Sequence, residues 1–413
     1  MSRTFVRLMV GVSLLATRSG IVTSQAGGAT PVTAPLVQSA NLVYQGAFRL
    51  PPGKFGPSTF EYGGTALAFN PARRSLFVVG HDQGQLVAEI SIPEVRTGPS
   101  VAFLATASVL QPFADVTEGA RSTVNRGDAV KIGGLLPYRG HLYLTAYGYY
   151  DAPGAQVVSH FVSGLDLSVH GDVGGPYQVG PSGFCGRPAC AGFVDGYFGA
   201  VPPEWQAVLG GPVLNGQCCV PIISRTSYGP SLFAIDPTQL GVTKPLPATP
   251  LVYYPSSNPL APWDSTNAYF NGSTEVKGVV FPQGTRSVLF FGRHGLGRYC
   301  YGDGAGEPAP AGQPTPDGYC YDPTSMYKGT HAYPYAYYVW AYDAVDLMAV
   351  KTGLKKPWAV KPYAAWKLEF PYETLKVDLN GAAYDPETAR IFLSQGFAEG
   401  DLPVIHVFKV QVP

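Results

Sequence analysis

The chain has 413 residues, of which 50 are Gly and 39 are Pro, and only 14% are charged. Helices tolerate neither so many glycines and prolines nor so few Lys and Glu, so the composition excludes a helical bundle, a coiled coil and a charged disordered chain. It fits many short strands joined by tight turns. With 28 Lys and Arg against 28 Asp and Glu, the formal net charge is zero. No overall charge therefore attracts nucleic acid or an anionic membrane surface, and neither is expected as a partner.

The N-terminus has the order of an export signal. Two arginines precede an apolar run from Leu8 to Thr17, and small residues follow up to Ala26. This order predicts a signal peptide over residues 1–26, although Arg18 follows so soon that an uncleaved anchor or a different start is an open alternative. Residues 27–40 read as a flexible leader. No later stretch reaches the roughly eighteen apolar residues of a membrane helix. The mature protein is expected to be secreted, extracellular or periplasmic, with no membrane span.

A proline turn followed by a compact apolar strand recurs along the chain. Four clear copies follow Pro71, Pro137, Pro282 and Pro386, and a degraded copy runs from Gly210 to Arg225. Small-residue strands rich in Gly precede the copies, and two further strands follow them. Four antiparallel strands with the smallest residues innermost are typical of a β-propeller blade, because inner strands crowd the central axis.

The repeats predict an all-β fold, a single β-propeller domain over residues 41–413 with five blades of four antiparallel strands. The last unit ends after its third strand, and Leu42 to Leu50 has the pattern of the missing outer strand. An N-terminal strand in that place would close the ring and remove the free sheet edges. A β-sandwich, or a propeller of six or seven blades, is the alternative.

Six cysteines fit an oxidising compartment. The neighbours Cys218 and Cys219 are expected at the turn of the third blade, on the face opposite the ligand loops, either bridged or as two thiols. A Gly- and Pro-rich insertion is predicted at 296–330. Zinc is a weak alternative, because the chain has no second CxxC and no His at ligand spacing. No metal and no cofactor are therefore expected. The simplest disulfide pairs are Cys185 with Cys190 and Cys300 with Cys320, the latter bracketing the insertion.

Carboxylates recur in the loops that lead into inner strands. Three of them stand three residues before a glycine, on blades one, four and five, which are neighbours around the ring. Carboxylates about 6.5–9.5 Å apart serve as general acid and general base in inverting glycosidases. The alternative is that each accepts backbone N–H bonds in its own turn. The candidate catalytic residues are Glu61, Glu275 and Asp378, with Asp128 in a shifted register on blade two; blade three offers Asp195 or Glu204 without a clear match.

The loops between second and third strands share that face, and their polar residues differ from blade to blade. Tyr rings stack on sugars, while Arg and Asp bind hydroxyl groups, so the set predicts one central carbohydrate site. Ordinary solvent-exposed loops in a chain with 26 Tyr are the alternative. The candidate ligand-binding residues are His81, Asp82, Tyr147, Tyr150, Arg225, Arg293 and His294.

The five-unit pattern resembles five-bladed β-propellers over residues 41–413. The segment FEYGGTALAFNPARRSLFVVGHD at 60–82 is similar to uncharacterised secreted bacterial and phage-associated propellers. More distantly, the chain resembles arabinanase- and levansucrase-like glycoside hydrolases and five-bladed lectins, although the Asp-Pro signature of those hydrolases is missing. The resemblance implies an extracellular glycan or small-molecule ligand. A glycoside hydrolase using the paired carboxylates, and a structural or assembly protein, are the alternatives.

Overall fold

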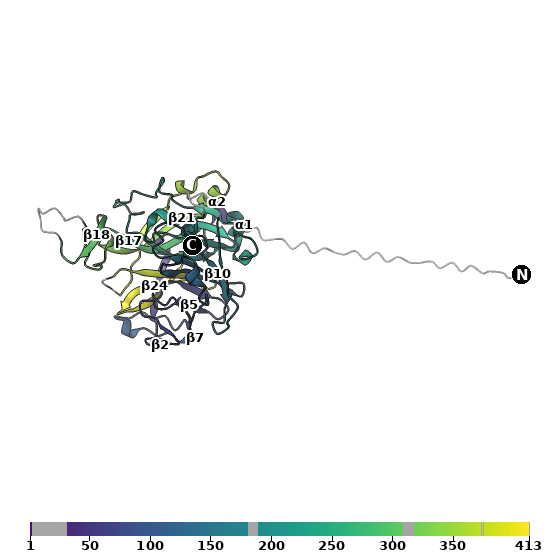
Figure 1. Ribbon diagram of the computed structural model, residues 1–413, viewed down its shortest axis with the longest axis horizontal. Coiled ribbons are helices and arrows are strands. Elements are labelled where there is room, and N and C mark those ends of the chain that lie inside the picture. The colour runs from purple at the N-terminus through teal and green to yellow at the C-terminus, as the bar shows by residue number, and fades with distance from the viewer. Residues whose placement is uncertain (2–30, 181–188, 309–317, 373, 375, 413) are drawn as a thin grey trace.

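The computed structural model describes residues 1, 31–180, 189–308, 318–372, 374 and 376–412. Within them the strands form five four-stranded antiparallel sheets (Figure 1). In the first three sheets the strands follow one another along the chain. The first sheet holds β4 (Leu67–Asn70), β5 (Ser75–Val79), β6 (Val87–Ser91) and β7 (Val109–Ala114). The second holds β8 (Val130–Tyr138), β9 (His141–Gly148), β10 (His160–Gly164) and β11 (Gly174–Tyr177), and the third β12 (Phe198–Ala200), β13 (Val213–Asn215), β14 (Leu232–Ile235) and β15 (Thr249–Val252).

The fourth and fifth sheets each depart from simple chain order. The fourth carries a long insertion between its second and third strands, and the fifth takes its outer strand from the N-terminal end. The fourth sheet holds β16 (Glu275–Val280), β17 (Ser287–Gly295), β21 (Tyr335–Asp343) and β22 (Ala364–Lys367). The fifth holds β23 (Leu379–Asp385), β24 (Arg390–Glu399), β25 (Leu402–Val410) and β1 (Leu42–Arg49).

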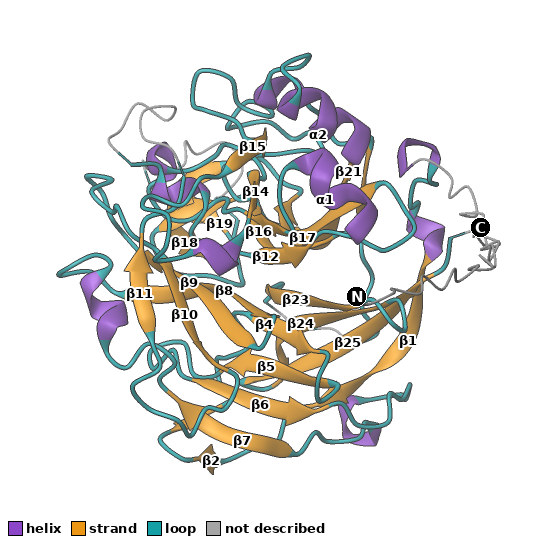
Figure 2. Ribbon diagram, turned by 90° about the vertical axis from the view of Figure 1, so that its right-hand side faces the viewer, coloured by secondary structure: helices purple, strands orange, loops and turns teal. Residues whose placement is uncertain are grey.

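The first strands of the five sheets contact one another in a cycle: β4 with β8, β8 with β12, β12 with β16, β16 with β23, and β23 with β4. Figure 2 shows β4 to β7 following one another outward from the centre, with β23, β24, β25 and β1 doing the same beside them. Sheets arranged radially around their inner strands make this an all-β propeller, as the sequence predicts. The count of five blades stays a prediction, which the five four-stranded sheets support.

Outer strand β1 is the N-terminal segment that the sequence assigns to this position. It pairs antiparallel with β25, from Leu42 opposite Val410 to Arg49 opposite Val404. Just beyond the strand, the Asn41 side chain donates a hydrogen bond to the Gln411 carbonyl, 370 residues away in sequence. The pairing covers the edge of the last sheet.

Glycine is required where inner strands meet. A Cβ on Gly278 would lie 2.4 Å from the Cβ of Ala382, and one on Gly134 would lie 2.5 Å from the Gly196 carbonyl oxygen. Such approaches are possible only without a side chain. The space left at the centre is about 10 Å³, room for about one water molecule at most. The inner strands therefore approach one another closely at the axis.

Helices and small sheets lie outside the propeller sheets. Helix α1 (Pro203–Leu209) follows β12, and α2 (Ala344–Lys351) follows β21 and contacts α1. The insertion forms a sheet of β18 (Cys300–Ala305), β19 (Tyr319–Tyr321) and β20 (Gly329–His331), and β2 (Lys54–Phe55) pairs with β3 (Ser58–Thr59). The 3-10 helices are Pro31–Thr33, Ser39–Asn41, Val101–Phe103, Ala120–Thr123, Ala191–Phe193, Ile223–Arg225, Pro237–Gln239 and Pro357–Ala359.

Two sequence predictions about local structure are wrong. The degraded repeat is not a pair of strands at 210–214 and 221–225: its inner strand is β12, its second strand is β13, and Ile223–Arg225 is a 3-10 helix. From Pro31 onward the leader also packs on the molecule. Val37 is fully buried, and its N–H donates to the Ser287 hydroxyl at 2.8 Å.

Candidate functional site

One side of the ring carries the connections between second and third strands, and we call it the loop face. Its five connections are residues 80–86, 149–159, 216–231, 296–334 and 400–401. The loops entering the inner strands reach the same side. Glu275 is the first residue of β16 and Asp378 immediately precedes β23, so both carboxylates stand at this end of their strands.

Arg293 joins these two carboxylates. It is paired with Glu275 across β16 and β17, and one guanidinium nitrogen donates to Glu275 Oε1. The other donates to Asp378 Oδ1 at 3.2 Å. Lys376 Nζ lies 2.8 Å from the second Asp378 oxygen, and Lys277 Nζ lies 3.4 Å from Glu275 Oε2. These five side chains, which we call the ion-pair cluster, link the fourth and fifth sheets.

The ion-pair cluster is half-buried, and its charges determine its protonation. Burial raises the pKa of Glu275, but the charges of Arg293 and Lys277 outweigh that effect and hold it at about 2. Burial likewise acts to lower the pKa of Lys277 and of Arg293, yet the facing carboxylates leave both raised. Glu275 is therefore ionised, and both cations are charged, throughout the physiological pH range.

Tyr335 connects the ion-pair cluster to the insertion. The Arg293 guanidinium lies 4.8 Å from the centroid of the Tyr335 ring, a cation–π contact. The Tyr335 hydroxyl donates to Asp322 Oδ2 at 2.7 Å, and the same oxygen lies 2.8 Å from Nδ1 of His331. Burial acts to raise the pKa of Asp322, but hydrogen bonds from His331, Thr324 and Tyr335 lower it. A buried, ionised Asp322 thus fixes the orientation of the Tyr335 ring.

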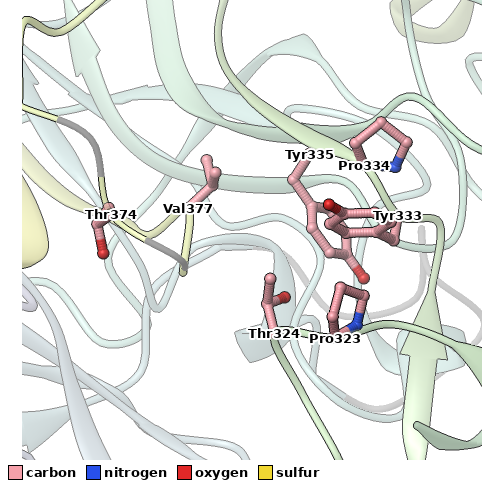
Figure 3. Close-up of a pocket in the computed structure, with 7 residues that line it drawn as sticks. All are labelled: Pro323, Thr324, Tyr333, Pro334, Tyr335, Thr374 and Val377. Atoms are coloured by element: carbon pink, nitrogen blue, oxygen red, sulfur yellow. The ribbon is translucent and has the colours of Figure 1, made fainter. Parts of the chain in front are cut away.

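A cavity of about 230 Å³ opens beside this ring, and we call it the Tyr335 cavity. In Figure 3 the Tyr333, Pro334 and Tyr335 side chains lie on one side of it, and Thr374 and Val377 lie on the other. One wall comes from the insertion and the other from the loop that ends at Asp378. Aromatic rings and prolines with a few polar groups make a lining that can hold a small organic ring. The lining residues are Pro323, Thr324, Tyr333, Pro334, Tyr335, Thr374 and Val377.

Two of the four predicted acids stand apart from the ion-pair cluster. Glu61 is exposed, and it accepts a long hydrogen bond of 3.5 Å from the Thr59 hydroxyl. It differs from Glu275 in register, because β4 begins only at Leu67. Asp128 accepts hydrogen bonds from the backbone N–H groups of Tyr150 and Asp151, at 2.7 and 2.8 Å. Asp128 therefore fastens a loop, as the alternative interpretation of these acids expects. Glu204 lies in the first turn of α1, on the far side of β12 from the loop face.

The predicted ligand-binding residues of the first two sheets lie on the loop face. Asp82 forms a 2.5 Å ion pair with Lys131, and the His81 ring accepts from the Gln83 N–H at 3.2 Å. Tyr147 is half-buried and interacts electrostatically with Lys277 and Asp82. Tyr150 is 57% exposed. Asp82 and Tyr147 thus border the ion-pair cluster, whereas Tyr150 projects into solvent.

Arg225 and His294 are buried and bonded within the chain, which argues against ligand contact. One Arg225 guanidinium nitrogen donates to the carbonyls of Gly148 and Tyr149, at 2.7 and 3.1 Å. The His294 ring bonds the Thr274 hydroxyl at 2.9 Å and the Asn267 carbonyl at 2.8 Å. Burial lowers the pKa of His294. Both side chains hold neighbouring loops in place.

Asp195 is a buried carboxyl group beneath the loop face. It is fully buried, and neither carboxyl oxygen has a hydrogen bond of normal geometry in the described chain. Burial raises its pKa to about 7, although Arg225 and Gln217 lie close enough to act in the opposite direction. In the sequence, Asp195 is an acid of the third blade that does not clearly match the position of the acids in the other blades. Its burial depends on packing between the second and third sheets, which no local pattern reports.

Cys218 and Cys219 form a disulfide, with Cα atoms 3.7 Å apart. The prediction that they lie on the face opposite the ligand loops is wrong. They lie in the connection between β13 and β14, on the loop face, and Cys218 forms an isolated β-bridge with Val276, the neighbour of Glu275. Cys300 and Cys320 are bridged as predicted, across a Cα distance of 5.7 Å. Cys185 lies outside the described residues, so its pairing with Cys190 stays a prediction.

No family model matches the sequence, and no curated protein is similar to it. Among solved structures, a candidate glycoside hydrolase of Bacteroides ovatus ATCC 8483 matches over 91% of this chain and 96% of its own, with 11% identity and a TM-score of 0.40. A glycosyl hydrolase of the same species matches over 90% and 95%, with 12% identity and a TM-score of 0.36. Raptor of Chaetomium thermophilum matches 90% of this chain and 30% of its own, with 9% identity and a TM-score of 0.30. At these identities and TM-scores the likeness does not extend to function.

The described residues include no helix both long enough and apolar enough to cross a membrane. Over the same part of the chain, no three His, Cys, Asp or Glu side chains gather as metal ligands would.

Proposed function

We propose that the protein is a secreted propeller that binds a saccharide on its loop face, at the Tyr335 cavity and the ion-pair cluster beside it. One observation carries the proposal: the Tyr335 ring forms a wall of the cavity, and Arg293 lies behind that ring, bonded to Glu275 and Asp378. A sugar ring presents an apolar face and a rim of hydroxyl groups. An aromatic wall next to ordered charged groups matches both features.

Export is part of the proposal. The signal-peptide pattern over residues 1–26 and the disulfides of Cys218 with Cys219 and of Cys300 with Cys320 support it. Disulfides persist in oxidising compartments and are rare in the cytosol.

The test is binding of the full-length protein to a panel of polysaccharide fragments, followed by calorimetry on the best of them. We expect Tyr335→Ala to weaken binding at least about tenfold, because truncation removes the stacking surface. Tyr327→Ala is the matched control, since Tyr327 belongs to the same insertion, is 85% exposed and does not line the cavity. Equal affinities for the wild type and Tyr335→Ala would exclude this cavity as the binding site.

Glycoside hydrolysis by Glu275 and Asp378 is the second candidate, favoured by their common bond to Arg293. An acid–base pair needs one carboxyl group that is protonated near neutral pH. Glu275 is ionised, and Asp378 is paired with the two cations Arg293 and Lys376. This charge distribution favours binding over turnover. A reducing-sugar assay on the saccharides that bind distinguishes the two functions. Turnover that disappears in Asp378→Asn would establish the hydrolase, and binding without turnover would support the binding protein.

A further inference from the structure

Lys277 lies at the centre of the loop face. It occupies the β-bulge of β16, where the register with β17 shifts between Val276 and Gly278. It also lines the narrow space at the axis, together with Gly133 and Ala382 of two other inner strands. The side chain is 30% exposed and interacts electrostatically with residues of three sheets, namely Tyr147, Glu275, Arg293 and Asp378.

The Lys277 ammonium group has N–H donors that can bind a ligand. An ammonium group carries three donors and no acceptor. Within the described chain its one ion pair is the 3.4 Å contact with Glu275 Oε2, which leaves two of its three N–H donors without a carboxylate partner. The other oxygen of Glu275 already accepts from Arg293. Asp378, the next carboxylate, is bonded by Arg293 and Lys376. Apart from Glu275 Oε2, the carboxylate oxygens of Glu275 and Asp378 are therefore already bonded to Arg293 or Lys376.

Cations outnumber carboxylates in the ion-pair cluster together with the neighbouring pair of Asp82 and Lys131. Each of the three carboxylates forms at least one ion pair, and the four cations exceed them by one positive charge. Beneath them, Arg225 and Asp151 carry opposite charges, and the raised pKa of Asp195 leaves its carboxyl group only partly ionised near neutral pH, so this layer does not cancel the surplus. A half-buried surplus charge is complementary to a ligand that carries one negative charge. The cations are Lys131, Lys277, Arg293 and Lys376, and the carboxylates are Asp82, Glu275 and Asp378.

We propose that the saccharide is anionic, and that Lys277 binds the charged group of a uronate or a sulfate-ester unit. This inference rests on the proposed function and names its ligand class. Contacts run from Lys277 through Glu275 and Arg293 to the Tyr335 ring. The proposed ligand places its anionic group at Lys277 and a neighbouring sugar ring against Tyr335.

The test measures calorimetric affinity of the full chain for three probes: an oligogalacturonate, the same oligomer with its carboxyl groups reduced to alcohols, and a sulfated neutral oligosaccharide of equal length. We expect at least one charged probe to bind about tenfold or more tightly than the reduced one at low salt. The preference should shrink as salt rises, because half-exposed charges are screened. Whether the oligogalacturonate or the sulfated probe binds more tightly distinguishes a carboxylate ligand from a sulfate ester.

Variants of Lys277 test whether this residue causes the preference for the charged probe. Lys277→Met removes the ammonium and keeps most of the stem, so the ratio of the affinities for the charged and the reduced probe should fall to about one. Lys277→Arg should retain most of the preference. Lys356→Met is the control for loss of a positive charge, because Lys356 is exposed and lies beside the 3-10 helix Pro357–Ala359, away from the site.

Failure of this inference is distinguishable from failure of the proposed function. Equal affinity for charged and reduced probes would overturn the inference and leave saccharide binding standing. A preference that survives in Lys277→Met would likewise overturn the assignment to Lys277. Absence of binding to every probe and to the wider polysaccharide panel would overturn both. If Lys277→Met fails to fold, the wild-type comparison across probes and salt still decides whether the ligand is anionic.

Discussion

The guanidinium of Arg293 lies 4.8 Å from the centroid of the Tyr335 ring. The two residues are close in space because β17 and β21 are paired strands of the fourth sheet, with Gly295 opposite Tyr335 at the end of the ladder. The insertion leaves the sheet at that end and returns to it. A rearrangement of the insertion would therefore move the ring away from the cation and change both the cavity and the ion-pair cluster.

Replacing Arg293 should affect both charge and stability. Arg293→Met leaves Glu275 and Asp378 without their shared cation, so the pKa of Glu275 should rise from about 2 toward or above its ordinary value of 4.5. We expect the free energy of unfolding to fall by about 1–3 kcal/mol, because two half-buried carboxylates lose their partner. NMR titration and urea denaturation measure the two effects. Arg74→Met, which breaks an exposed pair with Glu387, should change stability by less than about 0.5 kcal/mol. An unchanged pKa of Glu275 would contradict the assigned role of Arg293.

Asp195 should make the protein less stable as pH rises. Its pKa is about 7 in the folded state against 3.8 unfolded, so the folded state holds the proton more tightly. Stability from this group is full below about pH 4 and is lost as the pH rises to 7. The loss amounts to about 4 kcal/mol by linkage.

Asp195→Asn keeps the shape without the titration, so the difference in unfolding free energy between variant and wild type should grow from pH 4 to pH 8. The difference is the useful quantity, because the buried His160 and His406, whose pKa values burial lowers to about 3, act in the opposite direction below pH 6.5. A difference independent of pH would show that Asp195 is not a buried acid with a raised pKa.

The disulfide of Cys300 and Cys320 should support the Tyr335 cavity more than the propeller. It joins β18 and β19, and β18 pairs with β20, which leads to Tyr333 and Tyr335. Closing a loop of this length stabilises by about 3 kcal/mol in the chain-entropy account. We expect the double Ser variant to lose ligand affinity and to be cut within 296–334 by a protease, while its far-UV circular dichroism stays that of the wild type. Cleavage at equal rates in both proteins would contradict this expectation.

Adding a side chain at an inner strand should be strongly destabilising. A Cβ on Gly278 would lie 2.4 Å from Ala382 Cβ and 2.9 Å from the Ala382 nitrogen. Gly278→Ala should therefore lower the free energy of unfolding by about 1–3 kcal/mol, the usual result of overpacking. Gly329→Ala is the matched control in strand β20, where an added Cβ meets nothing within 4 Å. Similar stabilities for both variants would argue against close contact between the fourth and fifth sheets.

Removing the outer strand of the fifth sheet should expose an edge. A chain beginning at Pro51 lacks β1, so β25 loses its hydrogen-bonding partner and becomes free to pair with other molecules. We expect this truncation to aggregate during refolding. The control begins at Gly27, the mature start that the sequence predicts, and should refold as a soluble monomeric or oligomeric species of fixed size. Light scattering during refolding compares the two, and equal recovery would show that β1 is dispensable.

The sequence predicts the regular sheets better than the irregular one. Turns such as the one after Pro71 precede long apolar strands, whose pattern needs no tertiary information. The third sheet is not predictable in this way, because β12 and β13 have three residues each and α1 lies between them. For this reason the sequence predicts the wrong face for the cysteine pair. Strands this short carry too few residues for an alternation to be recognised.

The same contrast holds in the candidate site. An acid three residues before a glycine marks a strand start at Glu275 and Asp378, but not at Glu61, because Gly64 stands in a left-handed turn with φ +76° before β4 begins. Tyr335 and Lys376 join the site only through the approach of the insertion to the loop before β23. Contacts between segments so far apart depend on packing that no local pattern records.

The pairing of β1 with β25 also sets an order of events during synthesis. Asn41 and Gln411, which bond beside this pair, are 370 residues apart. At about 5–20 residues per second, a ribosome needs roughly 20–70 s between making the two strands. For that interval β1 has no partner of its own, and the ring cannot be completed from the N-terminus onward as a row of independent blades could. A chaperone that holds unpaired strands would therefore find β1 available until β25 has been made.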